Sequence, residues 1–360
     1  MARGYNAAGD VLKVLADGTD INSIWDEFIS TLDLANQKRS ALVDLFTFQT
    51  TAKGETVLQT PGGTSDFEEA SEYGVPKGAR LEAGMLPMGY TFKWYDLATR
   101  FTWKYLADAS ANQVAAVHNG ALEADNRLTF KAIMNRLFSN VNGVNEDGTT
   151  VYSLWNGTDG KAPPEHNGST FPSTHSHYLT TGTAALAPAD VEVLVDTVKH
   201  HGYGDGDGQT LVVLANPEEA DVIAGFRSGS GAKFDFIASD DAPPYLTAET
   251  LVGSRPSGQF NGLKVLGQYG YALIVSNPLI PAGYVACLAT GGSNSERNPI
   301  AFREHVQTSL QGLRIVKGKT PDYPLIDSYY NRGFGVGVRH RGAAAVLQVT
   351  TNASYTAPTF

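Results

Sequence analysis

The chain has 360 residues, a formal net charge of −10, 42% hydrophobic residues, 18% charged residues and one cysteine. This composition is typical of a folded, water-soluble protein and excludes a disordered or collagen-like chain. The acidic balance and the scattered Lys and Arg residues speak against a surface that grips nucleic acid.

The single cysteine and the start of the chain bear on location. Cys287 lies in the apolar run YVACLATG and has no second cysteine to pair with, so we expect a small buried hydrophobe. The first residues lack a basic segment followed by an apolar one, as a secretory signal would have. The chain contains no run of about 18 apolar residues, the length that would span a bilayer. These features fit a reducing cytoplasm.

The first 100 residues divide into a helical arm and a polar excursion. In INSIWDEFISTLDLANQ the apolar residues recur at three- and four-residue steps, which predicts a helix, and a second apolar patch ends at Phe46. Residues 49–100 are polar, with turn signals at PGG, GVPKG and MLPMG. Strands are predicted at Glu55–Gln59 and Gly89–Tyr95. An excursion with so few core residues is marginal alone and needs another surface to lie on.

The strongest helical signal covers about residues 103–139. Its apolar residues form one seam with many steps of three and four, and a continuous helix of that length would reach roughly 55 Å. Such a rod would act as a spine. His118 lies on it, and we expect it to be solvated or hydrogen-bonded rather than a ligand.

The rest of the chain alternates between helices and strands. Residues 140–186 are turn-rich with a predicted hairpin at NEDG, and the helix that follows should end at Gly202. From about residue 209 the pattern is α/β, with a helix that starts at Pro217. Further strands are predicted in QTLVVLAN, LKVLG, YALIVSN, YVACLAT, AFREHV, LRIVKG and DSYYNRGFGVGVRHRGAAAVLQVT.

Three glycines near the C-terminus, Gly333, Gly335 and Gly337, superficially suggest a phosphate-binding loop. Such a loop needs a strand-to-helix turn followed by a helix. Here Phe and Val alternate with the glycines in steps of two, and more strand follows. The pattern therefore predicts a strand with small residues on one face, where other parts of the chain pack closely.

Two segments contain candidate metal ligands. In STHSHY, His175 and His177 would face the same way on a strand, with His166, His200 and His201 elsewhere in the sequence. No acidic or Cys ligand is near them, so we expect a solvated loop. GYGDGDGQT resembles a calcium loop through Asp205 and Asp207, but it lacks the later Glu and the flanking helices, so we expect a plain turn.

No catalytic motif stands out in the sequence. There is neither a G-x-S-x-G elbow nor an H-E-x-x-H pair, and most acidic residues lie on predicted solvent faces. Catalytic groups that meet only in space stay possible on this evidence. We therefore expect no enzyme activity, no cofactor and no metal.

The order of these segments resembles the tailed-bacteriophage major capsid proteins with the Hong Kong 97-like fold, among them those of actinobacteriophages. The residues that carry the likeness are the spine DASANQVAAVHNGALEADNRLTFKAIMNRLF, the run GQYGYALIVSNPLIPAGYVACLATG and the terminal DSYYNRGFGVGVRHRGAAAVLQV. The resemblance covers nearly the whole chain, although its motifs are loose.

The resemblance implies an α+β fold with five parts. These are an N-terminal arm (1–48), an extended β-hairpin loop (49–100), a peripheral domain with the spine helix (101–208), an α/β axial domain (209–296) and the peripheral domain's C-terminal strands (297–360). Phe92, Trp94 and Tyr95 would then pack at or across a subunit boundary.

The resemblance also implies the function and the partners. The chain would assemble with itself in the bacterial host cytoplasm, as hexamers and pentamers of an icosahedral shell that encloses DNA without reading its sequence. Portal and decoration proteins would be further partners. The 48 residues before the loop are too few for an internal scaffolding segment, so a separate scaffolding protein, or none, is implied.

Some family members form a covalent crosslink between a loop Lys and an Asn of a neighbouring subunit. Lys53 and Lys77 lie in the corresponding region and Asn331 lies near the corresponding end, but no residue pattern fixes this chemistry.

Three alternatives remain open at this level. One is an encapsulin-type compartment that houses a cargo enzyme, which shares the fold. Another is a cytoplasmic α/β metal-dependent enzyme that uses the 209–296 lobe and the histidines. A third is another phage structural protein, such as a tail or decoration component.

Overall fold

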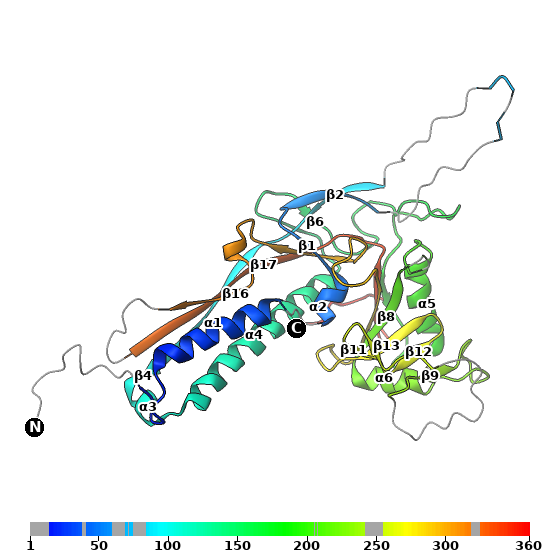
Figure 1. Cartoon of the computed structure of the whole chain (residues 1–360). Helices are drawn as coiled ribbons and strands as arrows, with labels where there is room; N and C mark the ends of the chain where they lie inside the picture. Colours follow the sequence, from blue (N-terminus) through cyan, green and yellow to red (C-terminus); the bar gives the residue numbers. More distant parts are fainter. Residues whose placement is uncertain are drawn as a thin grey trace, which may run out of the picture. The chain divides into compact units, whose positions relative to one another are not determined.

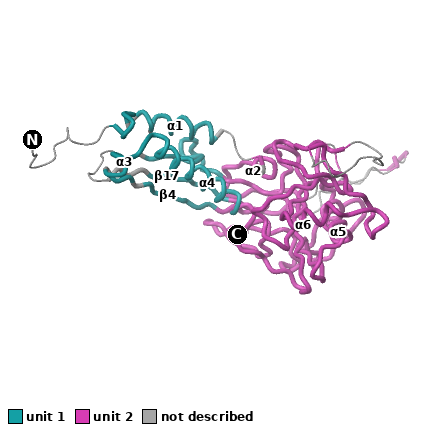
Figure 2. Tube along the Cα trace, turned by 90° about the horizontal axis from the view of Figure 1, so that it is seen from below, with its two compact units in different colours: residues 1–40, 92–131, 304–335 teal, residues 41–91, 132–303, 336–360 magenta. Residues whose placement is uncertain are grey.

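The computed structural model describes residues 14–37, 41–59, 69–70, 72–74, 84–204, 206, 208–241, 255–317 and 325–360. The chain forms two compact units, each assembled from three stretches of sequence (Figure 2). Unit 1 comprises residues 1–40, 92–131 and 304–335, and unit 2 comprises residues 41–91, 132–303 and 336–360. Both units therefore depend on contacts between segments far apart in the sequence.

Unit 1 combines helices with a long ribbon of strands (Figure 1). Its helices are α1 (Ile21–Gln37), α3 (Trp103–Asp108) and most of α4 (Ala111–Phe138), and its strands are β4 (Lys93–Thr102), β16 (Leu313–Lys317) and most of β17 (Leu325–Val338). The predicted four-residue spacing of α1 is confirmed, because Ile24, Phe28 and Leu32 are all buried on one face. They pack in two clusters with residues of α3, α4 and the ribbon.

The predicted helix over 103–139 is wrong in one respect, because the segment forms two helices. The Thr102 hydroxyl accepts a hydrogen bond from the first turn of α3 (3.2 Å), and extended backbone at Ala109 ends that helix. At the start of α4 the carboxylate of Asp17 accepts a hydrogen bond from the N–H of Ala111 (2.7 Å). The longer helix is therefore about 42 Å rather than 55 Å long.

His118 lies on α4 and is buried and hydrogen-bonded, which is one of the two environments that we expected for it. Its Nδ1 lies 2.7 Å from the Tyr330 hydroxyl, and its ring stacks on Phe28 with centroids 4.1 Å apart. Burial lowers the pKa of His118, so the ring is neutral at pH 7. It contributes to the core of unit 1.

A seven-stranded sheet with the order β7-β18-β14-β8-β13-β12-β9 forms the core of unit 2. Its strands are β7 (Tyr178–Thr180), β8 (Thr210–Ala215), β9 (Phe236–Ala238), β12 (Gly267–Tyr269), β13 (Ala272–Ser276), β14 (Tyr284–Thr290) and β18 (Ala344–Gln348). Helices α5 (Pro188–Lys199) and α6 (Pro217–Ala224) share one hydrophobic cluster with alternate sheet residues. Cys287 lies fully buried in that cluster, and burial raises its pKa, which confirms the expected structural role.

The predicted strands and helices of this lobe are confirmed. The side chain of Asn216 caps α6 at Pro217, and Gly202 follows α5 with a φ of +84°. The LKVLG segment divides between β11 (Leu263–Lys264), which pairs with β10 (Gln259–Phe260), and the start of β12. The N-terminal patch forms α2 (Ala41–Phe46), which contacts β14.

The polar excursion begins as a hairpin on unit 2. Strand β2 (Gly54–Leu58) pairs with β3 (Met85–Gly89), and the predicted NEDG hairpin forms β5 (Gly143–Val144) and β6 (Thr150–Val151). Beside them β1 (Thr47–Thr50) pairs in parallel with β15 (Ile300–Glu304). The single strand predicted at Gly89–Tyr95 is wrong, because the chain leaves β3 at Gly89 and starts β4 at Lys93. The alternating aromatic residues of this segment therefore belong to two different parts of the structure, with Tyr90 after β3 and Trp94 in β4.

Candidate assembly surface

The ribbon of unit 1 has two faces with different chemistry. Strand β4 pairs antiparallel with β17 over its whole length, and β16 pairs with β17 on the other side. Because side chains alternate between faces, the register assigns each aromatic residue to one face. In the described part of the chain, no strand pairs with the outer edge of β4. An edge strand of this kind is a template on which a strand of another chain can pair.

The first face of the ribbon exposes apolar residues. Trp94 is 46% exposed and lies over Gly333, its partner in the register. Tyr329 and Val316 are paired with one another on the same face, and both are also exposed. Large exposed apolar residues on one sheet face are typical of a surface that another molecule covers.

The second face packs against the helices of the same unit. Tyr95 points to this face and contacts the Phe334 ring at 5.2 Å between centroids. Arg332, its register partner, lies 3.4 Å from Asp125 of α4 in a nearly buried ion pair. Tyr95 is therefore held by its own chain.

The three predicted packing residues thus have different surroundings. Phe92 is half-buried and meets Trp94 edge-on at 5.3 Å between centroids. Of Phe92, Trp94 and Tyr95, the structure exposes Trp94 most. Contact with a neighbouring copy remains a prediction for all three, and Trp94 is the residue on which the exposed face depends.

The glycines of β17 have the role that their spacing predicts. A Cβ on Gly333 would lie 2.4 Å from the Trp94 ring, and a Cβ on Gly337 would lie 2.8 Å from the Gly89 carbonyl oxygen. Other parts of the chain therefore pack directly on the glycines, and the nearby residues continue as strand rather than as a helix. This excludes the phosphate-loop interpretation.

We predict that Gly333→Val destabilises the chain by about 1–3 kcal/mol, because the new side chain must displace the Trp94 ring. Urea unfolding of unassembled chain, followed by tryptophan fluorescence, measures this free energy. Gly143→Val is the matched control, because a Cβ at Gly143 meets open space. Equal unfolding midpoints for Gly333→Val and the parent chain would contradict this account of the ribbon.

In unit 2, charged residues hold the base of the β2–β3 hairpin. Lys53 Nζ lies 3.0 Å from Asp147, and the Asn145 side chain donates to the Lys53 carbonyl at 2.9 Å. Arg303 donates to the Tyr90 carbonyl (3.0 Å) and lies 2.6 Å from Glu146. The hairpin is therefore anchored to the β5–β6 turn at its base.

A second group of charged residues lies beside this hairpin. Glu55 accepts hydrogen bonds from the Tyr90 hydroxyl and from Arg339 Nε (3.0 Å). Burial alone would raise the pKa of Glu55, but these hydrogen bonds and the Arg339 charge outweigh it and lower the pKa. The carboxylate is therefore ionised at neutral pH and holds Arg339 against the hairpin.

Among the described residues of unit 2, the most deeply buried charged side chain is that of Arg341. Its guanidinium is 0% exposed, donates to the carbonyls of Ser153 (2.9 Å) and Leu154 (3.2 Å), and pairs with Asp159 at 2.6 Å. It also lies over the Trp155 ring at 4.0 Å. In the sequence Arg341 ends the triplet Arg339, His340, Arg341, and nothing in that triplet indicates that it is buried.

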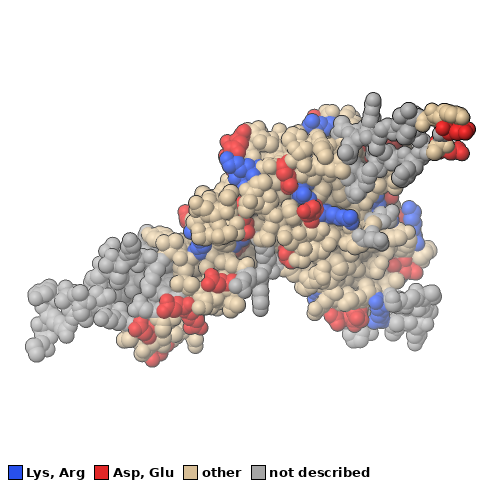
Figure 3. Space-filling view, turned by 45° about the horizontal axis from the view of Figure 1, so that its top comes forward, with Lys and Arg blue, Asp and Glu red and all other residues tan. Residues whose placement is uncertain are grey.

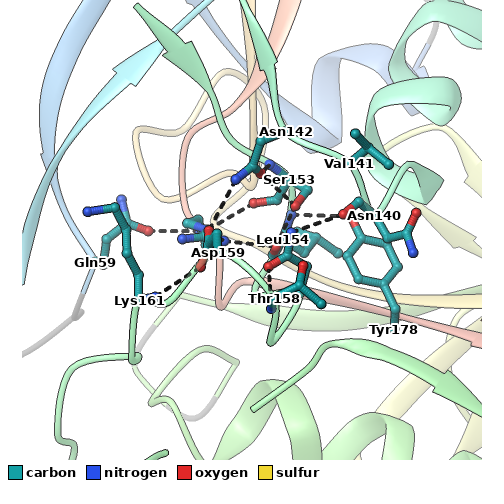
Figure 4. A network of polar contacts seen from close by, with 12 residues as sticks. Gln59, Asn140, Val141, Asn142, Ser153, Leu154, Thr158, Asp159, Lys161 and Tyr178 are labelled. Carbon is teal, nitrogen blue, oxygen red and sulfur yellow. Dashed lines mark hydrogen bonds and ion pairs between the residues drawn. The ribbon is translucent and has the colours of Figure 1, made fainter. Parts of the chain in front are cut away.

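Polar side chains extend the Arg341 network in several directions, as the dashed lines of Figure 4 show. Asn142 donates to Asp159 (3.2 Å) and accepts from Ser153, while the Tyr178 hydroxyl donates to the Ser139 carbonyl (2.6 Å). The Gln59 side chain accepts from the Arg341 N–H (2.9 Å). Gln59 directly follows β2, so this network fixes the point where the excursion leaves unit 2.

The crosslink candidates are engaged or lie outside the described residues. Lys53 pairs with Asp147, and Asn331 is hydrogen-bonded to both Arg314 and Asp96. Lys77 lies outside the described residues. Because Lys53 and Asn331 already have ionic or hydrogen-bonded partners, we predict that boiled, reduced shells run only at the 38.4 kDa monomer position on a denaturing gel. Ladders of dimers and larger species would contradict this.

The histidines have a different environment from the one that we expected. The solvated-loop prediction is wrong, because His177 and His201 are buried and His175, His177, His200 and His201 form one cluster. Sequence spacing missed this because the two pairs are separated by a turn, a strand and helix α5. Asp205 and Asp207 of the calcium-like segment lie outside the described residues.

The charges of the described surface are mixed. Figure 3 shows acidic and basic side chains in small groups on this face, without a broad basic patch among the residues that are coloured. No helix in the described part of the chain is long and apolar enough to cross a membrane.

Comparison with known proteins identifies the fold. A solved structure from Mycobacterium phage Patience is 38% identical, with a TM-score of 0.71 over 99% of this chain and 96% of that chain. The capsid of a native GTA particle is 14% identical, with a TM-score of 0.52 over 86% and 90% of the two chains. The mature capsid of bacteriophage PhiM1 is 9% identical, with a TM-score of 0.51 over 85% and 86%. The latter two show a common fold alone.

Searches of family profiles and of curated proteins give no match. The 38% identity over nearly the whole of both chains nevertheless shows a phage relative, and the fold is the one seen in the two capsid structures. The chain belongs to the tailed-bacteriophage major capsid proteins with the Hong Kong 97-like fold. It is a structural component of the virion capsid and not an enzyme, which answers the enzyme alternative.

Proposed function

We propose that the chain assembles as hexamers and pentamers of an icosahedral shell that encloses double-stranded DNA. The observation that carries this proposal is the 38% identity to the structure from Mycobacterium phage Patience, which extends over nearly the whole of both chains. Closed shells arise when one chain repeats the same contacts with symmetric copies of itself. Assembly takes place in the cytoplasm of the bacterial host.

The exposed ribbon face and the excursion supply the contacts between copies. Trp94, Tyr329 and Val316 gain apolar cover when a neighbour lies on the ribbon. Residues 49–100 act as the extended loop, with a base that Lys53 and the Arg341 network hold in place. Tyr73, in the described part beyond that base, is 92% exposed and is a further residue for a neighbour to bury.

The charge of the chain supports a role as a wall around DNA. The net charge of −10 repels phosphate, so the inner surface does not retain the DNA. The charged side chains visible in Figure 3 lie in small groups, some of them acidic only, and form no broad basic patch, which fits enclosure without sequence reading. Portal and decoration proteins, with a separate scaffolding protein where one is used, complete the assembly that the family implies.

Cryo-electron microscopy of phage particles that contain this chain tests the proposal. We expect six-fold and five-fold clusters of the chain around DNA that resists nuclease until the shell is opened. A shell filled with a cargo enzyme and free of DNA would contradict the proposal and favour the encapsulin alternative.

A further inference from the structure

Four histidines of unit 2 bring their ring nitrogens together. His175 Nε2 lies 3.0 Å from His201 Nε2 and 3.3 Å from His200 Nε2. Counting one ligand atom from each of these residues and from His177, all four atoms lie within 4.8 Å of one another. We propose that this four-histidine cluster binds one divalent transition-metal ion, with zinc as the ion that suits it best.

The local fold explains why the four rings meet. His200 and His201 directly follow α5, and His200 is its C-cap. His177 directly precedes β7, whose backbone partner is β18, and α5 also packs against β18. The cluster is therefore placed by a helix end and a strand start in the core of unit 2.

The buried ring of His177 is set up as a ligand. Its Nδ1 lies 2.7 Å from the Ala344 carbonyl oxygen, and only a protonated Nδ1 can donate there. The other nitrogen, Nε2, then carries the free lone pair, although it is fully buried and makes no hydrogen bond. A backbone carbonyl that orients a histidine in this way is the usual outer-shell partner of a metal ligand.

The distances between the ring nitrogens also fit a bound metal ion. With Zn–N distances of about 2.0–2.1 Å, two nitrogens of a tetrahedral site lie roughly 3.3 Å apart. The separations of His175 Nε2 from its two neighbours, 3.0 and 3.3 Å, are close to this value. A neutral imidazole has one N–H, so a cation satisfies the converging lone pairs better than hydrogen bonds among the rings.

The surroundings of the cluster shield it on one side and admit an ion on the other. Phe171 covers one side, with centroids 4.1 Å from His201 and 5.0 Å from His200. His175 and His200 remain partly exposed, which gives an ion a path from solvent.

Four protein ligands leave no open position, so the ion would be structural rather than catalytic. It would link the segment before β7 to the end of α5, two segments that the seven-stranded sheet already brings together. Imidazole ligands suit zinc, copper, nickel and iron, and the tetrahedral separations favour zinc among them.

The test uses the full chain without a polyhistidine tag, stripped with a chelator and dialysed against Zn²⁺ or Co²⁺ alone. We expect one retained Zn²⁺ per chain by mass spectrometry of the metal. Bound Co²⁺ should show the strong visible absorption of a tetrahedral site. Zn²⁺ should also raise the unfolding temperature of the chain, because binding to the folded state stabilises it.

His175→Ala and His200→Gln remove partly exposed ligands, and His305→Gln in unit 1 is the matched control. Loss of an outer-shell partner typically costs 10–100-fold in affinity, so loss of a ligand should cost at least about 100-fold. The control should bind as the parent does, and circular dichroism checks that each variant is folded. Equal Zn²⁺ affinity in the ligand variants would overturn the proposal. Absence of retained Zn²⁺ and of tetrahedral Co²⁺ absorption in the parent chain would overturn it independently of any variant.

Discussion

A chain in which a two-residue Asn-Gly turn replaces residues 60–83 is expected to fold and to form no shells. The ends of the deleted stretch are adjacent, because the Gln59 N–H donates to the Gly84 carbonyl at 2.8 Å. A tight turn can join two such residues without a change in the β2–β3 register. The deletion therefore removes the part of the excursion beyond the β2–β3 hairpin and keeps the anchored hairpin itself.

We expect the loss of assembly because the hairpin base that remains contacts only its own chain. In the described part of the chain, charged pairs and the Arg341 network hold the hairpin base to unit 2. The contacts that we propose for the excursion lie beyond that base, as the 92% exposure of Tyr73 illustrates, and the ribbon face alone is not expected to hold a shell together. Without them each copy keeps its fold but loses the cover that a neighbour supplies.

Sedimentation velocity and negative-stain electron microscopy measure the assembly of this variant, and circular dichroism measures its fold. A second variant with a Gly/Ser segment of equal length separates loss of contacts from loss of length, and it should also fail to assemble. Shells at normal yield from either variant would show that residues 60–83 are dispensable.

Arg341→Ala is expected to destabilise the unassembled chain by about 3–5 kcal/mol. The substitution leaves the Asp159 carboxylate without its cation, and it leaves the Ser153 and Leu154 carbonyls without their donor. Loss of one member of a buried ion pair typically costs this much, because an uncompensated charge stays buried. The exposed Arg127→Ala should change the free energy of unfolding by less than about 0.5 kcal/mol, since its pair with Glu123 lies in solvent.

The effect of Arg341→Ala should shrink in acid. Burial alone would raise the pKa of Asp159, but the Arg341 charge and several hydrogen bonds outweigh it and lower the pKa. A carboxyl whose pKa is lower in the folded state stabilises the fold above its unfolded pKa, and this contribution is lost as the pH falls below about 4. Urea unfolding of both chains between pH 7 and pH 3 measures the difference. A pH-independent difference would show that the Arg341–Asp159 charge interaction is not its source.

Much of the fold follows from periodic patterns in the sequence. The steps of Ile24, Phe28 and Leu32 specify a helix with one buried face, and the alternation of Gly333 to Val338 specifies a strand. These patterns depend on near neighbours in the chain, so they survive without tertiary information. The resemblance to the capsid family rests on the order of such elements.

Most features that the sequence did not predict involve contacts between distant residues. The break before α4 depends on Asp17, which lies 94 positions from the Ala111 N–H that it accepts. Burial of Arg341 depends on Asp159, and the histidine cluster depends on the pairing of β7 with β18. No spacing rule relates residues that a sheet brings together, so the sequence offers the four histidines as candidate ligands without indicating that they meet.

Sedimentation velocity of the unmodified chain at high concentration tests most directly whether the exposed surface needs other copies to cover it. The account predicts particles of many copies, with residues 49–100 becoming resistant to protease only in those particles. A stable 38.4 kDa species that resists protease in the same region while it stays alone would contradict it.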